Sequence, residues 1–99
     1  MWFVYVVRCS DQSLYTGVTT DAERRIEEHN DGRGARYTRS RGPVKLVYLE
    51  QVLDRGTALK REHEIKRMSV AGKKALVARA NASKRKRASR RAMTSLPRS

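Results

Sequence analysis

The chain has 99 residues, which suits a single domain with one modest hydrophobic core. Its 23 lysines and arginines outnumber its 10 acidic residues and give a net charge of +13, which favours a polyanionic partner such as nucleic acid. Cys9 is the only cysteine, which excludes an internal disulfide framework, and the apolar run at residues 2–7 is too short to span a membrane. We therefore expect a soluble, cytoplasmic protein.

A β-hairpin and a helix are predicted in the first third of the chain. Met1 to Cys9 is rich in valine and aromatic residues and apolar on both faces, which is typical of a central strand. Leu14 to Thr19 follows a turn and predicts the returning strand. A helix then begins, with Thr20 as the expected N-cap, Glu23 completing a capping box, and Gly32 at the C′ position.

The inward face of this helix is unusually polar. Helical spacing places Ala22, Arg25, Ile26 and His29 on one stripe. A purely structural helix would carry leucine or valine at the positions of Arg25 and His29. We interpret the stripe as presenting a fixed positive charge and an imidazole to the sheet.

The middle of the chain predicts a loop, a strand and a second helix. Residues 33–43 are basic, carry one aromatic residue, and contain the glycines and proline typical of a loop. Residues 44–53 alternate as a third strand, with Val44, Leu46 and Tyr48 expected on one face and Val47 and Leu49 on the other.

The second helix is expected to start at Thr57 as its N-cap, and its apolar face includes Glu62, while Glu64 falls on the outer face. Ser69 is the expected cap of a third helix at 70–80. Residues 82–99 hold seven basic residues and no acidic one, with too few apolar residues to fold, and we expect a disordered basic tail. The prediction is an α+β domain at 1–81, in which a small three-stranded, mostly antiparallel sheet is flanked by helices.

Five polar residues in otherwise apolar positions suggest chemistry on phosphodiesters: Tyr5, Tyr15, Arg25, His29 and Glu62. A carboxylate can hold a hydrated divalent cation, and a guanidinium can bind two phosphate oxygens. A tyrosine or histidine can take a proton from an attacking water. One carboxylate supports one metal ion rather than a two-metal site.

These residues resemble the motifs of the GIY-YIG nucleases. Phe3-Val4-Tyr5 corresponds to the Gly-Ile-Tyr strand motif, with phenylalanine in place of glycine, and Tyr15-Thr16-Gly17 corresponds to Tyr-Ile-Gly. The family's catalytic arginine matches Arg25, and a histidine found one helical turn later in some members matches His29. The family's metal-binding glutamate matches Glu62. The resemblance extends over about residues 2–80 and is strongest for the small stand-alone, single-domain members.

The resemblance implies a divalent-metal-dependent endonuclease that hydrolyses DNA phosphodiester bonds, with single-stranded or branched DNA favoured, in DNA repair or processing. Glu62 would hold one Mg²⁺ or Mn²⁺ ion, and Arg25 would bind the scissile phosphate. Tyr5 would be the general base, His29 would assist as proton acceptor, and Tyr15 would orient phosphate or water. Basic and aromatic residues of the loop, the second helix and the tail would bind the DNA: Arg33, Arg36, Tyr37, Arg39, Arg41, Lys45, Lys66, Lys84, Arg85, Lys86 and Arg87.

Each of these residues also has a structural interpretation. The two tyrosines could be ordinary strand aromatics, and Arg25 could pair with Glu28. His29 could interact with the helix dipole, and Glu62 could pair with Lys66. The alternative functions are a nucleic-acid-binding module on the same fold without turnover, and an RNA-binding accessory protein that acts through the tail.

Overall fold

The sheet is built around β1 (Trp2–Arg8), which pairs antiparallel with β2 (Leu14–Thr19) on one side and with β3 (Lys45–Val52) on the other. The computed structural model describes residues 1–80, and the predicted tail at 82–99 lies outside them. Because β1 is central, its valines are buried on both faces, as its continuous apolar run predicts. The three-stranded antiparallel sheet and the α+β fold class are confirmed.

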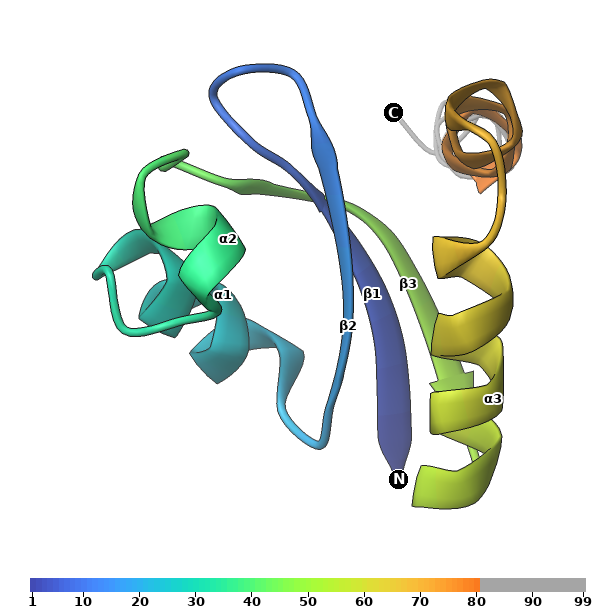
Figure 1. The fold of residues 1–99 in the computed structure, drawn as a ribbon. Helices are drawn as coiled ribbons and strands as arrows, with labels where there is room; N and C mark the ends of the chain where they lie inside the picture. The colour runs from blue at the N-terminus through green and yellow to red at the C-terminus, as the bar shows by residue number, and fades with distance from the viewer. Residues whose placement is uncertain (81–99) are drawn as a thin grey trace, which may run out of the picture.

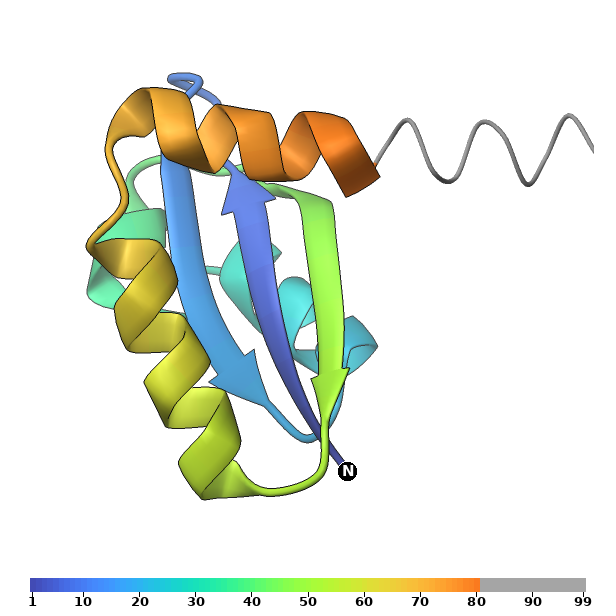
Figure 2. The same cartoon turned by 90° about the vertical axis from the view of Figure 1, so that its right-hand side faces the viewer.

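Helices cover both faces of the sheet. Figure 1 shows α1 (Ala22–Asn30) and α2 (Arg36–Arg39) against one face and α3 (Arg55–Lys66) against the other. Residues 70–80 form a further helix, which crosses the end of the sheet where β1 finishes (Figure 2). No helix within residues 1–80 is long and apolar enough to cross a membrane.

Each face of the sheet has its own hydrophobic cluster. On the α3 side, Val4 and Val6 pack with Ala58 and Ile65, all nearly inaccessible to solvent. On the α1 side the cluster contains Tyr5, Val7, Cys9 and Val44, with Tyr15 and Ile26 packed against it. The tyrosines of the hairpin therefore lie on the α1 side.

The helix ends differ in part from the prediction. Gly32 has a φ of 76°, as expected for the residue that ends α1. Thr20 is not the N-cap of α1, because the Asp21 side chain accepts a hydrogen bond from the backbone N–H of Arg24. Likewise, Thr57 is not the cap of α3, because Asp54 accepts from the N–H of Thr57.

Ser69 caps the 70–80 helix as predicted, since its hydroxyl accepts from the N–H of Gly72 at 3.0 Å. At the starts of α1 and α3, by contrast, an aspartate lies just before the first helical turn, and its carboxylate caps a helix at least as well as a threonine hydroxyl.

Two further expectations were wrong. The segment predicted to be loop, 33–43, contains the short helix α2. The predicted alternation of the third strand is broken by an irregularity in its pairing with β1, where Val6 pairs with Tyr48 but Val7 pairs with Leu46. The extra residue, Val47, places Tyr48 in the cluster on the α3 side rather than with Leu46.

Candidate active site

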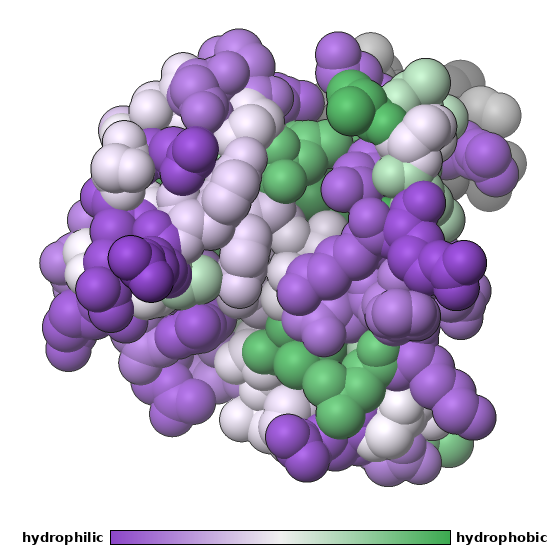
Figure 3. Space-filling view, in the orientation of Figure 1, coloured by the Kyte–Doolittle hydropathy of each residue, from purple (hydrophilic) through white to green (hydrophobic). Residues whose placement is uncertain are grey.

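The five polar residues singled out from the sequence meet along β2. This strand forms one edge of the sheet, and in Figure 1 it stands in front, between α1 and α3. The space-filling view of the same edge shows a strip of weakly polar residues running between strongly hydrophilic surfaces on either side (Figure 3). Because the strand is at an edge, side chains from helices on opposite faces can approach one another there.

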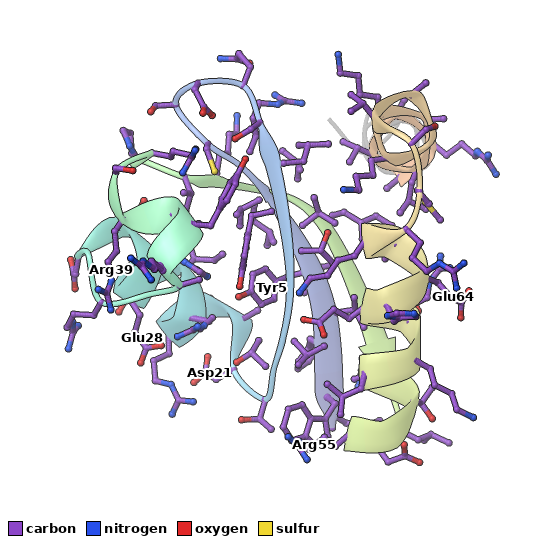
Figure 4. The ribbon with its side chains drawn as sticks, in the orientation of Figure 1. Tyr5, Asp21, Glu28, Arg39, Arg55 and Glu64 are labelled. Carbon is purple, nitrogen blue, oxygen red and sulfur yellow. The ribbon has the colours of Figure 1, made fainter. Side chains whose placement is uncertain are left out.

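The Tyr5 hydroxyl is the centre of the site. Tyr5 is 1% exposed, and Figure 4 shows it in the interior between α1 and α3. Burial raises the pKa of Tyr5, the Arg25 guanidinium opposes that rise, and the charges of Tyr15 and Glu62 add to it. Charges from the hairpin, α1 and α3 therefore act on one hydroxyl group, and that of Glu62 has the smallest effect.

His29 is held by hydrogen bonds at both ring nitrogens. Its Nε2 lies 2.8 Å from the Tyr5 hydroxyl, and its Nδ1 lies 2.7 Å from the hydroxyl of Thr38 on α2. The side chain is 1% exposed, and burial, followed by the positive charge of Arg25, lowers the pKa of His29. The imidazole is therefore neutral at neutral pH, which argues against a role as a cation at the end of α1.

Arg25 is half-buried and faces the same hydroxyl. Its pKa is raised first by its contact with Tyr5 and also by Glu28, whereas burial lowers it. The alternative pairing is present as well, because Arg25 Nη1 lies 3.0 Å from Glu28 Oε1. The guanidinium thus combines an ion pair on α1 with a place beside Tyr5.

Glu62 is the carboxylate of the site. Its side chain is 19% exposed, and its Oε2 lies 3.4 Å from Lys66 Nζ, so the alternative ion pair on α3 is also present. Within residues 1–80 no group of three or more His, Cys, Asp or Glu side chains could enclose a metal ion. One carboxylate fits a Mg²⁺-like ion that keeps most of its water and takes further oxygens from a phosphate. The residues therefore fit one hydrated ion and do not form an all-protein cage.

A column of stacked side chains continues outward from the site. The Tyr15 ring lies edge-on to His29, with centroids 5.5 Å apart, and it stacks on Tyr37 at 5.8 Å. The Arg41 guanidinium lies 4.1 Å from the centre of the Tyr37 ring. Lys66 Nζ lies 5.9 Å from the centre of the Tyr15 ring. These contacts connect the basic segment around α2 to Tyr15.

The sequence matches the GIY-YIG catalytic domain over residues 1–75. The chain belongs to the GIY-YIG family.

Its relatives within the GIY-YIG family are small proteins. A UPF0213 protein of Desulfotalea psychrophila is 58% identical over 77 residues, which cover 77% of this chain and 70% of the relative. A UPF0213 protein of Haloquadratum walsbyi is 64% identical over 64 residues, which cover 65% and 72%. The solution NMR structure of a UPF0213 protein from Bacillus halodurans has a TM-score of 0.52 at 44% identity, covering 79% of this chain and 84% of that one.

The GIY-YIG motifs have a direct geometric meaning in this chain. Tyr5 pairs with Gly17 across the hairpin, and a Cβ atom at Gly17 would overlap the Tyr5 hydroxyl and lie 2.6 Å from Cζ. The glycine of the second motif therefore gives the tyrosine of the first the space to lie across the strand. Gly34 has a similar role toward His29, because a Cβ there would overlap Nδ1 and lie 2.8 Å from Cγ.

The basic residues expected to bind DNA differ in their surroundings. Arg33 pairs with Asp31 at 2.9 Å, and Arg41 pairs with Asp11 at 3.1 Å. Lys66 is exposed on α3 and pairs with Glu62 at 3.4 Å. The remaining basic residues of this set within residues 1–80 are exposed on α2 and at the start of β3: Arg36, Arg39 (Figure 4) and Lys45. Lys84, Arg85, Lys86 and Arg87 lie outside the described residues.

Sequence reasoning missed two contributors to the site. Thr38 is 0% exposed and bonds His29, but it lies in a segment too short to show helical periodicity. Gly34 was interpreted as loop punctuation, and nothing in the sequence marks its contact with the imidazole. Asn30 has a structural role that the sequence did not predict. Its side-chain oxygen accepts a hydrogen bond from the N–H of Val44 at 2.7 Å and so holds the residue before β3 to the end of α1.

Proposed function

We propose that this protein is a divalent-metal-dependent endonuclease that hydrolyses DNA phosphodiester bonds. The observation that supports the proposal is the buried hydrogen bond between Tyr5 and His29, together with the charges of Arg25 and Glu62 that act on the same Tyr5 hydroxyl. A nucleic-acid-binding surface alone does not need a buried tyrosine–histidine hydrogen bond with a guanidinium and a carboxylate beside it. A hydrolytic site can use each of these groups, as a proton acceptor, as a charge that stabilises the transition state and as a metal ligand.

Each residue has a distinct task in the proposed reaction. The Arg25 guanidinium binds the scissile phosphate and stabilises the charge that builds on its oxygens in the transition state. The Tyr5 oxygen takes a proton from the attacking water while the Tyr5 hydroxyl proton passes to His29. The water oxygen bonds to phosphorus, the bond to the leaving oxygen breaks, and that oxygen takes a proton from solvent. Tyr15 orients the phosphate or the water.

Glu62 would hold the metal ion. A bound Mg²⁺ or Mn²⁺ ion supplies Lewis-acid polarisation of the phosphate and stabilises the leaving oxygen. The exposed arginines of α2, the column formed by Tyr15, Tyr37 and Arg41, and the tail would bind the DNA backbone and unstacked bases. This arrangement favours single-stranded or branched DNA over an unperturbed duplex.

The experiment is cleavage of end-labelled single-stranded, flap and duplex DNA in Mg²⁺, Mn²⁺ or EDTA by wild type, Glu62→Gln and Glu64→Gln. The two glutamates lie on the same helix, but Glu64 is 63% exposed and lies on the side of α3 away from the site (Figure 4). We expect EDTA to abolish cleavage and Glu62→Gln to lower its rate at least about 100-fold with DNA binding retained, because several kcal/mol of transition-state stabilisation are lost. Glu64→Gln should cut like wild type.

Two outcomes would contradict the nuclease proposal. One is a Glu62→Gln protein that cuts as fast as wild type. The other is a wild-type protein that binds these DNAs but cuts none of them in any metal, which would favour the non-catalytic binding module.

A further inference from the structure

The direction of the hydrogen bonds around His29 follows from Thr38. The Thr38 hydroxyl donates its single proton to the carbonyl oxygen of Ala35 at 2.9 Å, and a carbonyl can only accept. Thr38 Oγ1 also lies 2.7 Å from His29 Nδ1. With that proton donated to Ala35, Oγ1 is left to accept in this second bond, and Nδ1 then carries the hydrogen.

The neutral imidazole has one ring proton, so a hydrogen on Nδ1 leaves Nε2 with a lone pair. The Tyr5 hydroxyl lies 2.8 Å from Nε2 and must therefore donate to it. Tyr5, His29 and Thr38 are each at most 1% exposed, and every buried polar side-chain atom within residues 1–80 has a hydrogen-bond partner in the structure. The chain of bonds runs in one direction, from the Tyr5 hydroxyl through His29 and Thr38 to the Ala35 carbonyl.

We infer that Thr38 is a positioning residue: by accepting a hydrogen bond from His29 Nδ1, it selects the imidazole tautomer whose Nε2 accepts the Tyr5 proton. The short helix α2 places it there, because Ala35 is the N-cap of α2 and also accepts from the Thr38 N–H at 3.0 Å. Gly34 lets the chain pass closely around the imidazole. The segment from Gly34 to Thr38 thus wraps the ring and fixes its orientation.

The consequence for catalysis rests on the proposed function. When the Tyr5 oxygen takes a proton from water, its own proton must leave, and only an unprotonated Nε2 can receive it. With the opposite tautomer, Nε2–H would donate to Tyr5, and the tyrosine would have no acceptor for its proton. After transfer, the imidazolium keeps its Nδ1–H bond to Thr38, which helps to stabilise the positive charge.

The tautomer can be measured without any cleavage assay. Histidine labelled with ¹⁵N gives ring-nitrogen NMR signals that distinguish a protonated from an unprotonated nitrogen. The chain has two histidines, and His63 is exposed on α3, so it serves as an internal reference for His29. We expect His29 in wild type to show a protonated Nδ1 and an unprotonated Nε2 at pH values where it is neutral.

Two substitutions test the part played by Thr38. Thr38→Val keeps the shape but removes the acceptor, and we expect the Nδ1–H signal of His29 to weaken in favour of the other tautomer. Thr38→Ser keeps the hydroxyl and should retain the wild-type pattern. In cleavage, Thr38→Val should lower kcat about 10- to 100-fold with little change in KM, a part of the usual contribution of general acid–base catalysis, and Thr38→Ser should restore most of it.

An Nε2–H tautomer in wild type, or an unchanged His29 spectrum in a folded Thr38→Val protein, would overturn the inference. Should Thr38→Val fail to fold, the wild-type and Thr38→Ser spectra still decide the tautomer. Absence of cleavage by wild type would count against the nuclease proposal and leave the tautomer assignment to the NMR result, so the two failures are distinguishable.

Discussion

We expect the substitution Gly17→Ala to destabilise the fold, because the added methyl group would clash with Tyr5. An alanine Cβ would overlap the Tyr5 hydroxyl and lie 2.6 Å from Cζ and 3.0 Å from Cε1, and Tyr5 is 1% exposed, with little space to move into. Overpacking of this kind costs about 1–3 kcal/mol, and losing the bond from Tyr5 to His29 costs about 1 kcal/mol more. We expect unfolding free energy to fall by about 2–4 kcal/mol and the melting temperature by at least about 8 °C in a domain of this size.

Thermal melting and urea denaturation measure the effect, and Gly56→Ala is the matched control. Gly56 lies in the first turn of α3, where the nearest atom to an added Cβ is Asp54 Oδ1 at the ordinary distance of 3.5 Å. That variant should be neutral or more stable by up to about 1 kcal/mol, because alanine favours a helix over glycine. A Gly17→Ala protein that melts like wild type and still cleaves DNA would refute the steric reasoning.

Two further predictions concern stability. The pKa of His29 is lowered by burial and then by Arg25. Well above about pH 6.5 the group is therefore neutral in both states, and as the pH falls through that value the unfolded chain takes up the proton first. The free energy of unfolding should therefore decrease as pH falls below about 6.5, by at most about 1.4 kcal/mol per pH unit from this group. Urea denaturation of wild type and His29→Gln between about pH 7.5 and pH 5 measures this effect, and the unfolding free energy of the variant should depend less on pH. Asn30→Ala removes the hydrogen bond at 2.7 Å to the Val44 N–H, so the free energy of unfolding should fall by about 1–2 kcal/mol and hydrogen exchange of the Val44 amide should become faster. Gln51→Ala, at an exposed position of β3, is the control and should change neither quantity. An unchanged exchange rate at Val44 in Asn30→Ala would contradict this role.

Much of the fold could be predicted because its signals are local. The valine run of β1 and the turn before β2 predict a hairpin, and the polar positions on the inner stripe of α1 indicate that this helix carries more than packing residues. The structure brings Arg25 and His29 to the hairpin tyrosines, as this stripe suggested. Helical spacing also placed Glu62 toward the sheet and Glu64 outward, and their exposures of 19% and 63% agree.

Two of the errors, the bulge in β3 and the role of Thr38, share one physical origin, because both depend on contacts between separate segments of the chain. The bulge at Val47 comes from pairing with β1, and no alternation within β3 can reveal an extra residue. Thr38 acquires its role only because α2 folds back onto α1, nine residues from His29 along the chain. The capping residues of α1 and α3 were predicted wrongly for a different reason. Asp21 and Asp54 lie close to threonines that could also cap, and which side chain caps the helix depends on the residue at which the backbone becomes helical.

The position of β2 at the edge of the sheet explains how residues from both sides can form one site. α1 and α3 lie on opposite faces, and a central strand would separate their side chains by the full thickness of the sheet. At the edge, Gly17 has no side chain, so the Tyr5 hydroxyl lies across the strand and senses Arg25 from one side and Glu62 from the other. The tyrosine and glycine of the two GIY-YIG motifs are therefore a single steric requirement. Either one without the other would leave the guanidinium and the carboxylate with no shared group between them.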